Sequence, residues 1–364
     1  MVTDQRARGG RRRATLADVA REAGVSASTA SLAVNSSGPV SAATRERVLA
    51  AARRLGYLGP DPLARSLRRG RSGVVAVVVS ERLGYAFSDP MMATLLDGLA
   101  EEIGGAGGSL LLVPVHRSSG GTDGTGGNGG GGTGLGGLAM DAAVLLDCGV
   151  RAADLLPGLL ARGVTVVTID GPLDLGVPNV GIDDEGGTRA LVEHLAGLGH
   201  HDVGVVTLPL GAPVDDGTAP GVPRRRTAAA RAALVALTGH PGRFVTADRN
   251  TVEEGERAAG ALLDAPVPPT ALVAQSDVLA LGCLRAASAR GLDVPGDVSV
   301  AGFDGVDLHL LEGTRLTTVE QPTARKGQVA AQLVLAALAG DRPDDVRLPI
   351  TLRIGTTTGP SPER

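Results

Sequence analysis

The chain begins with an arginine-rich stretch followed by a helical repeat of apolar residues. Over residues 16–23 the apolar positions follow the i, i+3, i+4, i+7 spacing of one helical face: Leu16, Val19, Ala20 and Ala23. Gly24 can adopt the positive φ that ends such a helix, and Ser26 can cap a second helix from Ala27 to about Asn35. The pattern therefore predicts two short helices joined by a three-residue turn.

A third helix is predicted to begin near Ser41 and to pack beneath the first two. Its apolar positions are Val48, Leu49, Ala52 and Leu55. Two helices joined by a tight turn with a glycine are typical of the helix-turn-helix, whose second helix lies in the major groove of DNA. A three-helix scaffold that binds protein remains the alternative at this point.

The second helix is predicted to be apolar inside, with small and hydroxylated residues outside. Ala30, Ala33 and Val34 would face the core. The residues left outside are Ala27, Ser28, Thr29, Ser31, Leu32 and Asn35. Short hydroxyl side chains suit contacts with phosphates and base edges, so this face favours a nucleic-acid partner.

Beyond Gly73, strand-like apolar runs alternate with helical segments. The candidate strands are residues 74–79, 110–115, 142–147, 164–170, 202–208, 271–275 and 297–304. Nearly continuous apolar strands separated by helices indicate parallel sheets covered on both faces, and this many units predicts two sheets. Such folds bind ligands at the carboxyl ends of their strands, where this chain has Asp170, Ser276, Asp277 and Asp304.

One glycine-rich segment, residues 116–140, interrupts this alternation where a helix is expected. Glycine is less favourable than alanine in a helix by roughly 0.5–1 kcal/mol, so we expect a disordered insert here. The segment matches no phosphate-binding motif, because it lacks a Gly-Lys-Ser/Thr sequence and the only lysine of the chain is Lys326.

Charge is divided unequally along the chain. Residues 1–71 hold 14 arginines against 5 acidic residues, a balance of +9, and the remainder holds 21 basic against 34 acidic residues, a balance of −13. A basic head on an acidic body predicts that only the head meets a polyanion, although a merely solvated charge run would give the same counts.

Length and composition indicate a modular protein of the cytoplasm. The 364 residues suggest two or three domains, and 43% of them are apolar, enough for sizeable cores. No apolar run approaches the ~20 residues of a membrane span, and the N-terminus lacks a secretory signal. Two cysteines, Cys148 and Cys283, offer no disulfide framework and fit a reducing compartment.

No catalytic or metal-binding constellation is visible, so the chain is not expected to be an enzyme and no cofactor is expected. A nucleophile elbow, a zinc signature and a Walker motif are all absent from the sequence. His200 and His201 end a predicted helix and are interpreted as caps rather than metal ligands.

Between head and body lies "GPDPLARSLRRGRSG", residues 59–73, whose two prolines, short helical stretch and arginines indicate a hinge. This segment, together with "TLADVAREAGVSASTASLAVN" and "VSAATRERVLAAARRLGY", resembles the DNA-binding head and hinge of the lactose-repressor (LacI/GalR) family. In that family, hinge helices of two subunits pair in the minor groove and a leucine from each wedges into a base step. Leu67 matches that leucine and Ala64 its small neighbour.

The body resembles the same family through "VGIDDEGGTRALVEHLAGLGH", "AQSDVLALGCLRAASARGLDVPGDVSVAGFD" and "LTTVEQP". The resemblance implies a periplasmic-binding-protein-like effector domain with two parallel-sheet subdomains and a ligand cleft between them. The implied effector-binding residues are Phe87, Asp89, Asp170, Arg226, Ser276, Asp277, Phe303 and Asp304. Ala27, Ser28 and Leu32 depart from the usual base-reading residues, which predicts more methyl contact and shape readout.

Aromatic residues point independently to a sugar-like ligand. The chain has only five, and Tyr85, Phe87 and Phe303 fall at loops predicted to border the cleft. Aromatic faces beside carboxylates and an arginine suit a polyol or sugar ring. The alternative is that these rings simply fill gaps under loops.

The sequence therefore predicts a ligand-responsive, sequence-specific regulator, most simply a homodimeric repressor of a palindromic operator. The alternatives are a cytoplasmic sugar receptor whose head does not read DNA, and an enzyme with a DNA-binding head. The predicted DNA-binding residues are Thr15, Leu16, Ser26, Ala27, Ser28, Thr29, Ser31, Leu32, Asn35, Tyr57, Ala64 and Leu67. The expected divisions are a disordered basic arm (1–14), a DNA-binding domain (15–60), a hinge helix and linker (61–71), and effector subdomains at 72–182 plus 323–350 and at 183–322 plus 351–358.

Overall fold

The fold is described from a computed structural model, which forms two compact units, Met1–Ser72 and Gly73–Arg364. The structure describes residues 14–57, 70–79, 84, 87, 89–115, 134–146, 152–172, 175–210, 221–307 and 313–363. The hinge residues Ala64 and Leu67 lie outside the described residues.

The first unit contains the three predicted helices, α1 (Leu16–Ala23), α2 (Ala27–Val34) and α3 (Ala42–Leu55). Gly24 takes the expected left-handed conformation, φ 64°, and Ser26 and Ser41 cap the helices that follow them. The expected core is confirmed at Val48 and Ala52, but Leu49 and Leu55 are each 37% exposed. Ala51 takes the buried place instead, because α3 turns a slightly different face toward α1 and α2 than the predicted stripe.

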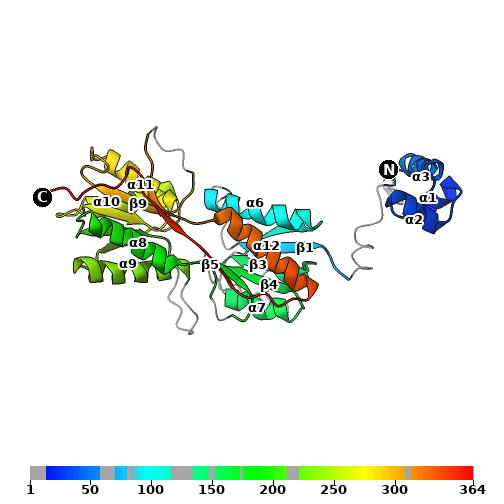
Figure 1. The fold of residues 1–364 in the computed structure, drawn as a ribbon, viewed down its shortest axis with the longest axis horizontal. Coiled ribbons are helices and arrows are strands. Elements are labelled where there is room, and N and C mark those ends of the chain that lie inside the picture. The colour runs from blue at the N-terminus through cyan, green and yellow to red at the C-terminus, as the bar shows by residue number, and fades with distance from the viewer. Residues whose placement is uncertain are drawn as a thin grey trace, which may run out of the picture. The chain divides into compact units, whose positions relative to one another are not determined.

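The second unit contains two six-stranded sheets with helices between the strands (Figure 1). The first sheet has the order β11-β5-β4-β3-β1-β2 and is parallel throughout. Its strands are β1 (Val74–Val79), β2 (Ser109–Pro114), β3 (Ala142–Leu146), β4 (Thr165–Ile169), β5 (Asn179–Ile182) and β11 (Val346–Leu348). Its helices are α6 (Pro90–Gly105), α7 (Ala152–Leu160) and α12 (Thr323–Ala339).

The second sheet repeats this plan with the order β12-β10-β9-β8-β6-β7. Its strands are β6 (Val203–Thr207), β7 (Arg243–Thr246), β8 (Ala271–Ala274), β9 (Ser299–Asp304), β10 (Thr317–Glu320) and β12 (Thr351–Arg353). Its helices are α8 (Asp184–Gly197), α9 (Val222–Thr238), α10 (Val252–Leu263) and α11 (Asp277–Ser288). The sheet is parallel as expected except at its edge, where β12 runs antiparallel to β10.

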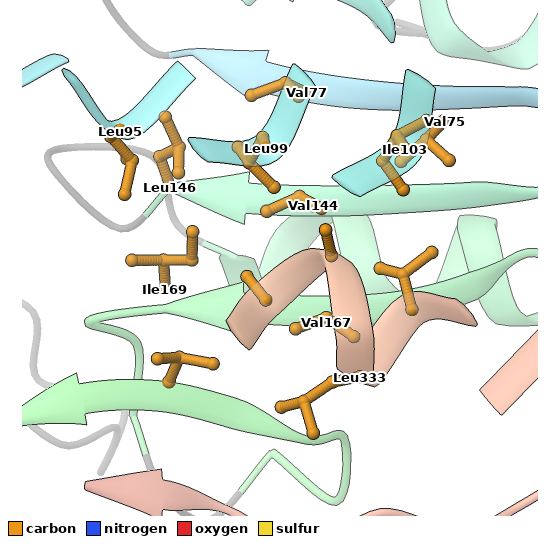
Figure 2. Close-up of a cluster of buried hydrophobic side chains, with 14 of the residues drawn as sticks. Val75, Val77, Leu95, Leu99, Ile103, Val144, Leu146, Val167, Ile169 and Leu333 are labelled. Carbon is orange, nitrogen blue, oxygen red and sulfur yellow. The ribbon is translucent and has the colours of Figure 1, made fainter. Parts of the chain in front are cut away.

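The core of the first sheet lies between its strands and the helix pair α6 and α12. Figure 2 shows Leu95, Leu99 and Ile103 of α6 meeting the valines of β1 and β3, with Leu333 of α12 over Val167 of β4. β3 is buried along its whole length, as expected for a central strand covered on both faces.

The expected disordered insert is corrected at its end. Residues 116–133 lie outside the described residues, but Gly134–Gly137 form a 3₁₀ turn, and Leu135 and Met140 are buried against the sheet. Arg162 donates hydrogen bonds to the carbonyl oxygens of Leu135 (2.7 Å) and Leu138 (2.6 Å). The apolar residues among the glycines order this stretch, because burying them offsets the entropy of fixing glycine.

The described chain passes between the two sheets at three places: after β5, after β10, and between β11 and β12. The carboxyl ends of β4 and β9 carry Asp170 and Asp304, both with positive φ (58° and 126°). A positive φ is strained for a residue other than glycine, and such strain occurs preferentially at functional sites. In the described part of the chain, we find no helix with the length and apolar character needed to cross a membrane.

Candidate functional site

The start of α2 presents the exposed hydroxyl face that the sequence predicts. Ser26, Ala27 and Ser28 are exposed, and Thr29 is half-buried. The Ser26 hydroxyl accepts from the Thr29 amide (3.1 Å) and lies 2.8 Å from each of the Ser28 and Thr29 hydroxyl oxygens. The Ser28 and Thr29 hydroxyl groups therefore lie within hydrogen-bonding distance of Ser26 at the N-terminus of α2, the positive end of the helix dipole.

Farther along α2, Leu32 forms an apolar patch that is 36% exposed. It packs against Gly38, where an added Cβ would lie 3.1 Å from Leu32 Cδ2. Asn35 follows it at the helix end and donates to the Ser31 hydroxyl over 3.3 Å. The Gly38 backbone limits the positions open to the Leu32 side chain, whose exposed part therefore forms a fixed apolar spot on the surface of α2.

Three other predicted DNA-binding residues have structural partners within the head. The Thr15 hydroxyl and amide both donate to Asp18, whose own amide donates back to Thr15 in a capping box. These hydrogen bonds lower the pKa of Asp18 to about 2. Leu16 and Tyr57 pack against the helical core, which places most of each side chain inside the head.

In the second unit, Asp170 is paired with a residue that sequence reasoning did not assign to the site. Lys326 of α12 donates to both carboxylate oxygens of Asp170, over 2.9 and 2.8 Å, and to Oε1 of Gln321 over 2.6 Å. The Lys326 side chain is 2% exposed. The sequence did offer a reason to consider Lys326, because it is the only lysine among 35 basic residues.

The carboxamide of Gln321 continues this network into the second sheet. Its Nε2 donates to Asp304 Oδ1 over 2.7 Å, and Arg226 Nη1 lies 3.6 Å from the same oxygen. Arg226 donates through Nε to Asp184 (2.8 Å) and through Nη1 to the carbonyl oxygen of Gln275 (2.7 Å). The predicted residues Asp170, Arg226 and Asp304 are therefore brought together, joined by Gln321.

Arg225 adds a second connection between this network and Asp170 of the first sheet. Its Nη2 donates to Asp184 Oδ2 over 3.0 Å and to the carbonyl oxygen of Asp170 over 3.2 Å. Asp184 is not among the residues expected from the sequence to bind effector, yet both of its oxygens accept from arginines. Burial acts to raise the pKa of Asp184, but the two guanidinium groups hold it below its usual value.

A second link between the sheets joins two helix starts. Asn250 donates to Asp89, the N-cap of α6, over 3.3 Å, and it accepts from the hydroxyl of Ser276, the N-cap of α11. Burial raises the pKa of Asp89. The predicted residues Asp89 and Ser276 thus face each other across Asn250, which sequence reasoning missed because an isolated asparagine carries no distinctive pattern.

Of the remaining predicted residues, Asp277 and Phe303 are buried next to the network and Phe87 is exposed. Asp277 is fully buried, accepts from Thr318 (2.6 Å) and from the Val306 amide (2.9 Å), and has a pKa that burial raises to about 6. Phe303 is buried beneath the Arg226 guanidinium, whose Cζ lies 3.5 Å from the centroid of the ring. Phe87 is 59% exposed, and Tyr85 lies outside the described residues.

A hollow of about 590 Å³ opens beside this network. It is lined by Asp170, Arg225 and Asp184 together with the edge of the first sheet at β5 and β11. Asp304 shares the buried side of the network, where burial raises its pKa well above the usual value. Among the described residues, no group of histidine, cysteine and acidic side chains could hold a metal ion.

Comparison with known proteins accounts for both units. Residues 15–59 match the lacI family of bacterial regulatory proteins, and residues 192–358 match a periplasmic binding protein-like domain. The HTH-type transcriptional regulator Rv3575c of Mycobacterium tuberculosis is 38% identical over 367 residues, which cover 96% of this chain and 98% of that protein. The chain belongs to the LacI family.

Other known proteins are similar to this chain over 90–95% of its length. The HTH-type transcriptional repressor CytR of Escherichia coli is 30% identical over 327 residues, 90% of each chain. A crystal structure of the lac repressor dimer bound to operator and the anti-inducer ONPF is 26% identical, with a TM-score of 0.77 over 95% of this chain and 99% of that one. A CelR–cellobiose complex is 30% identical, with a TM-score of 0.63 over 95% and 100%.

Membership of the LacI family confirms three predictions made from the sequence. The head is a helix-turn-helix, the body is a periplasmic-binding-protein-like effector domain, and the protein is a DNA-binding transcriptional regulator rather than an enzyme.

Proposed function

We propose that this LacI-family regulator is a homodimeric repressor of a palindromic operator, released or engaged by a small molecule, most simply a sugar, bound between its two sheets. The observation that carries the proposal is the network from Asp170 through Gln321 to Arg226, because it joins the carboxyl ends of strands in both sheets. A ligand that entered this network would alter the link between the sheets.

On the DNA side, the reading face proposed for α2 is unusually apolar. Ala27, Ser28 and Leu32 are exposed, and none of the three carries the long polar side chain that makes a bidentate contact with a base. Methyl contact, hydroxyl contacts with phosphates and insertion of Leu67 into the minor groove would then supply most of the affinity. The arginine-rich arm would add a contribution that salt weakens.

On the ligand side, we assign effector contact to Asp170, Arg226, Asp304 and Asp89. Asp170 and Asp304 lie at the carboxyl ends of strands, and Asp89 and Arg226 lie at or near the start of helices. Each of the four side chains takes part in the polar contacts that join the two sheets. The likeness to a CelR–cellobiose complex supports a carbohydrate as the ligand. Asp277 and Phe303 support the site from within, because their side chains are buried.

A fluorescence anisotropy titration against palindromic and random duplexes tests the regulator proposal. We expect the full chain to prefer a palindromic site by at least about 10³-fold at matched salt. Deleting residues 1–71 should abolish that preference. Equal affinity for every duplex, or specific binding without the head, would refute the proposal.

The ligand is tested by thermal-shift measurements with neutral sugars and nucleosides. A true effector at 100 times its Kd should add about 2.7 kcal/mol to the stability of the protein. It should also change operator affinity, and by reciprocity the operator should change effector affinity by the same factor. A compound that stabilises the protein but leaves operator binding unchanged would not be the effector.

A further inference from the structure

The ammonium group of Lys326 has no hydrogen left for a new partner in this structure. Its three hydrogen bonds run to the two oxygens of Asp170 and to Oε1 of Gln321, over 2.9, 2.8 and 2.6 Å. An ammonium group has three donors, so these bonds use all of them. A ligand can therefore contact Lys326 only by replacing one of these acceptors.

Gln321 is the acceptor that a ligand can replace most easily. Its carboxamide oxygen is neutral, whereas the bonds from Lys326 to Asp170 join two groups of opposite charge and are stronger. The same carboxamide donates through Nε2 to Asp304 over 2.7 Å. The Gln321 carboxamide thus accepts from Lys326 through Oε1 and donates to Asp304 through the neighbouring Nε2.

The surrounding charges favour an uncharged replacement. Lys326 faces Asp170, Arg225 and Arg226 face Asp184, and Arg226 also lies near Asp304. Three basic groups therefore face three carboxyl groups, and Asp89 and Asp277 add further acidic groups whose charge acts on Asp304. A charged ligand group in the place of Gln321 would add a buried charge without a partner, which is strongly unfavourable.

Replacement of Gln321 by a ligand would affect the helices that cover the first sheet, because Gln321 and Lys326 lie at or near the start of one of them. Gln321 lies where the chain crosses from β10 to α12, and Lys326 lies near the start of α12. The next residue, Gly327, packs so tightly on α6 that an added Cβ would lie 2.2 Å from the carbonyl oxygen of Leu95. Because α6 and α12 are in backbone contact, a shift of Lys326 would move both helices together.

We propose that Lys326 is a specificity-determining residue of the cleft. It selects an uncharged ligand group that takes the place of the Gln321 carboxamide, accepting from Lys326 and donating to Asp304. A vicinal diol and a primary amide both have this arrangement of donor and acceptor. The inference rests on the proposed effector site and names the chemistry that the site accepts.

Chemical rescue of Gln321→Ala in the full chain tests this inference without knowledge of the natural effector. The substitution removes the carboxamide, so we expect a lower melting temperature than that of the parent protein. Acetamide and ethylene glycol should restore part of the loss, while acetate and methylammonium at equal concentration and ionic strength should not. Gln328→Ala is the matched control, since Gln328 follows seven residues later on α12 and its carboxamide donates to Glu101 at the surface.

Two results would overturn the inference: rescue by acetate equal to that by acetamide, or no rescue by any of the four compounds. A further variant isolates Lys326. Adding Lys326→Met and Asp170→Asn to Gln321→Ala keeps the site free of unpaired charge, and we expect acetamide rescue to disappear. Persistent rescue would mean that Lys326 is not the selecting residue.

Operator binding of the parent protein, measured in parallel by anisotropy, reports on the proposed function alone. If acetamide restores the melting temperature of Gln321→Ala but the parent protein does not prefer the operator, the regulator proposal is refuted and the Lys326 inference is supported. If the parent protein prefers the operator but no compound restores the melting temperature of Gln321→Ala, the Lys326 inference is refuted and the regulator proposal is supported.

Discussion

Asp184 Oδ1 accepts a 2.8 Å hydrogen bond from Nε of Arg226, and the two side chains are only 3% and 5% exposed. The second oxygen of Asp184 accepts from Arg225. A buried carboxylate with two guanidinium partners is satisfied, but each partner would be left charged and poorly solvated if the carboxylate were removed.

Asp184→Ala should therefore lower the free energy of unfolding of the second unit by about 3–5 kcal/mol, the usual cost of breaking a buried pair. Urea titration followed by circular dichroism measures this loss. Glu185→Ala is the matched control, because Glu185 is the exposed neighbour in the same helical turn. Equal losses in the two variants would contradict the role given to the Asp184 pair.

Gly98 is expected to tolerate no side chain. An added Cβ would lie 2.2 Å from the carbonyl oxygen of Ala324, where α6 meets α12. Gly98→Ala should destabilise the protein by at least about 1–3 kcal/mol, the range for overpacking. Gly104→Ala in the same helix should instead be neutral or stabilising by up to about 1 kcal/mol, because nothing lies within 4 Å of its Cβ position. Similar melting temperatures for the two variants would refute the close helix contact.

His200 should make stability dependent on pH. Its ring nitrogens contact the hydroxyls of Thr270 (2.9 Å) and Ser299 (3.0 Å), and burial lowers the pKa of the ring below 6.5. The unfolded state then binds more protons, so the stabilisation is complete above pH 6.5 and is lost as the pH falls below that value. Melting temperatures between pH 7.5 and 5 should fall less steeply for His200→Gln than for the parent.

The exposed His201 provides the control for this experiment. His201→Gln should keep the parental slope, and the comparison cancels contributions from other groups such as Asp277, whose pKa burial raises to about 6. An unchanged slope in His200→Gln would show that the ring does not contribute. The sequence interpretation of His200 as a helix cap holds for its amide, which donates to the Leu195 carbonyl oxygen over 3.1 Å, but not for its buried side chain.

In the head, Ser26 and Ser28 should separate folding from DNA contact. The Ser26 hydroxyl caps α2 through the Thr29 amide, so Ser26→Ala should cost about 1 kcal/mol of local stability, visible as faster hydrogen exchange of the helix amides. Ser28→Ala removes an exposed hydroxyl that caps no helix, so exchange should be unchanged while operator affinity falls. The assignment fails if Ser28→Ala loosens the helices or leaves operator binding unaltered.

Much of the fold could be predicted because its signals are local. Helix caps at Ser26 and Ser41 and the αL glycine Gly24 act within a few residues of each helix end. Seven apolar strands were found within one or two residues of their observed bounds. Among the described residues, periodicity could not reveal five further strands, because each has only three or four residues and a mixed polar pattern: β5, β7, β10, β11 and β12.

The candidate site was predicted only in part. Asp170 and Asp304 were expected from their places at strand ends and Arg226 from the family resemblance, and the structure places all three in one network. Asp277 was expected to face the ligand, but its oxygens hold Thr318 and the Val306 amide inside the second sheet. Burial and pairing of polar side chains depend on residues far away in sequence, which no local pattern specifies.

The sequence by itself determined the helical head, the alternation of apolar strands and helices, and the charge difference between head and body, because each depends on neighbouring residues or on composition. Only the tertiary structure decided which charges meet. Lys326 and Asp170 are 156 positions apart and lie within 3 Å solely because α12 returns to cover the first sheet after the chain has built the second. Their pairing follows from chain crossing and from the cost of leaving either charge buried alone.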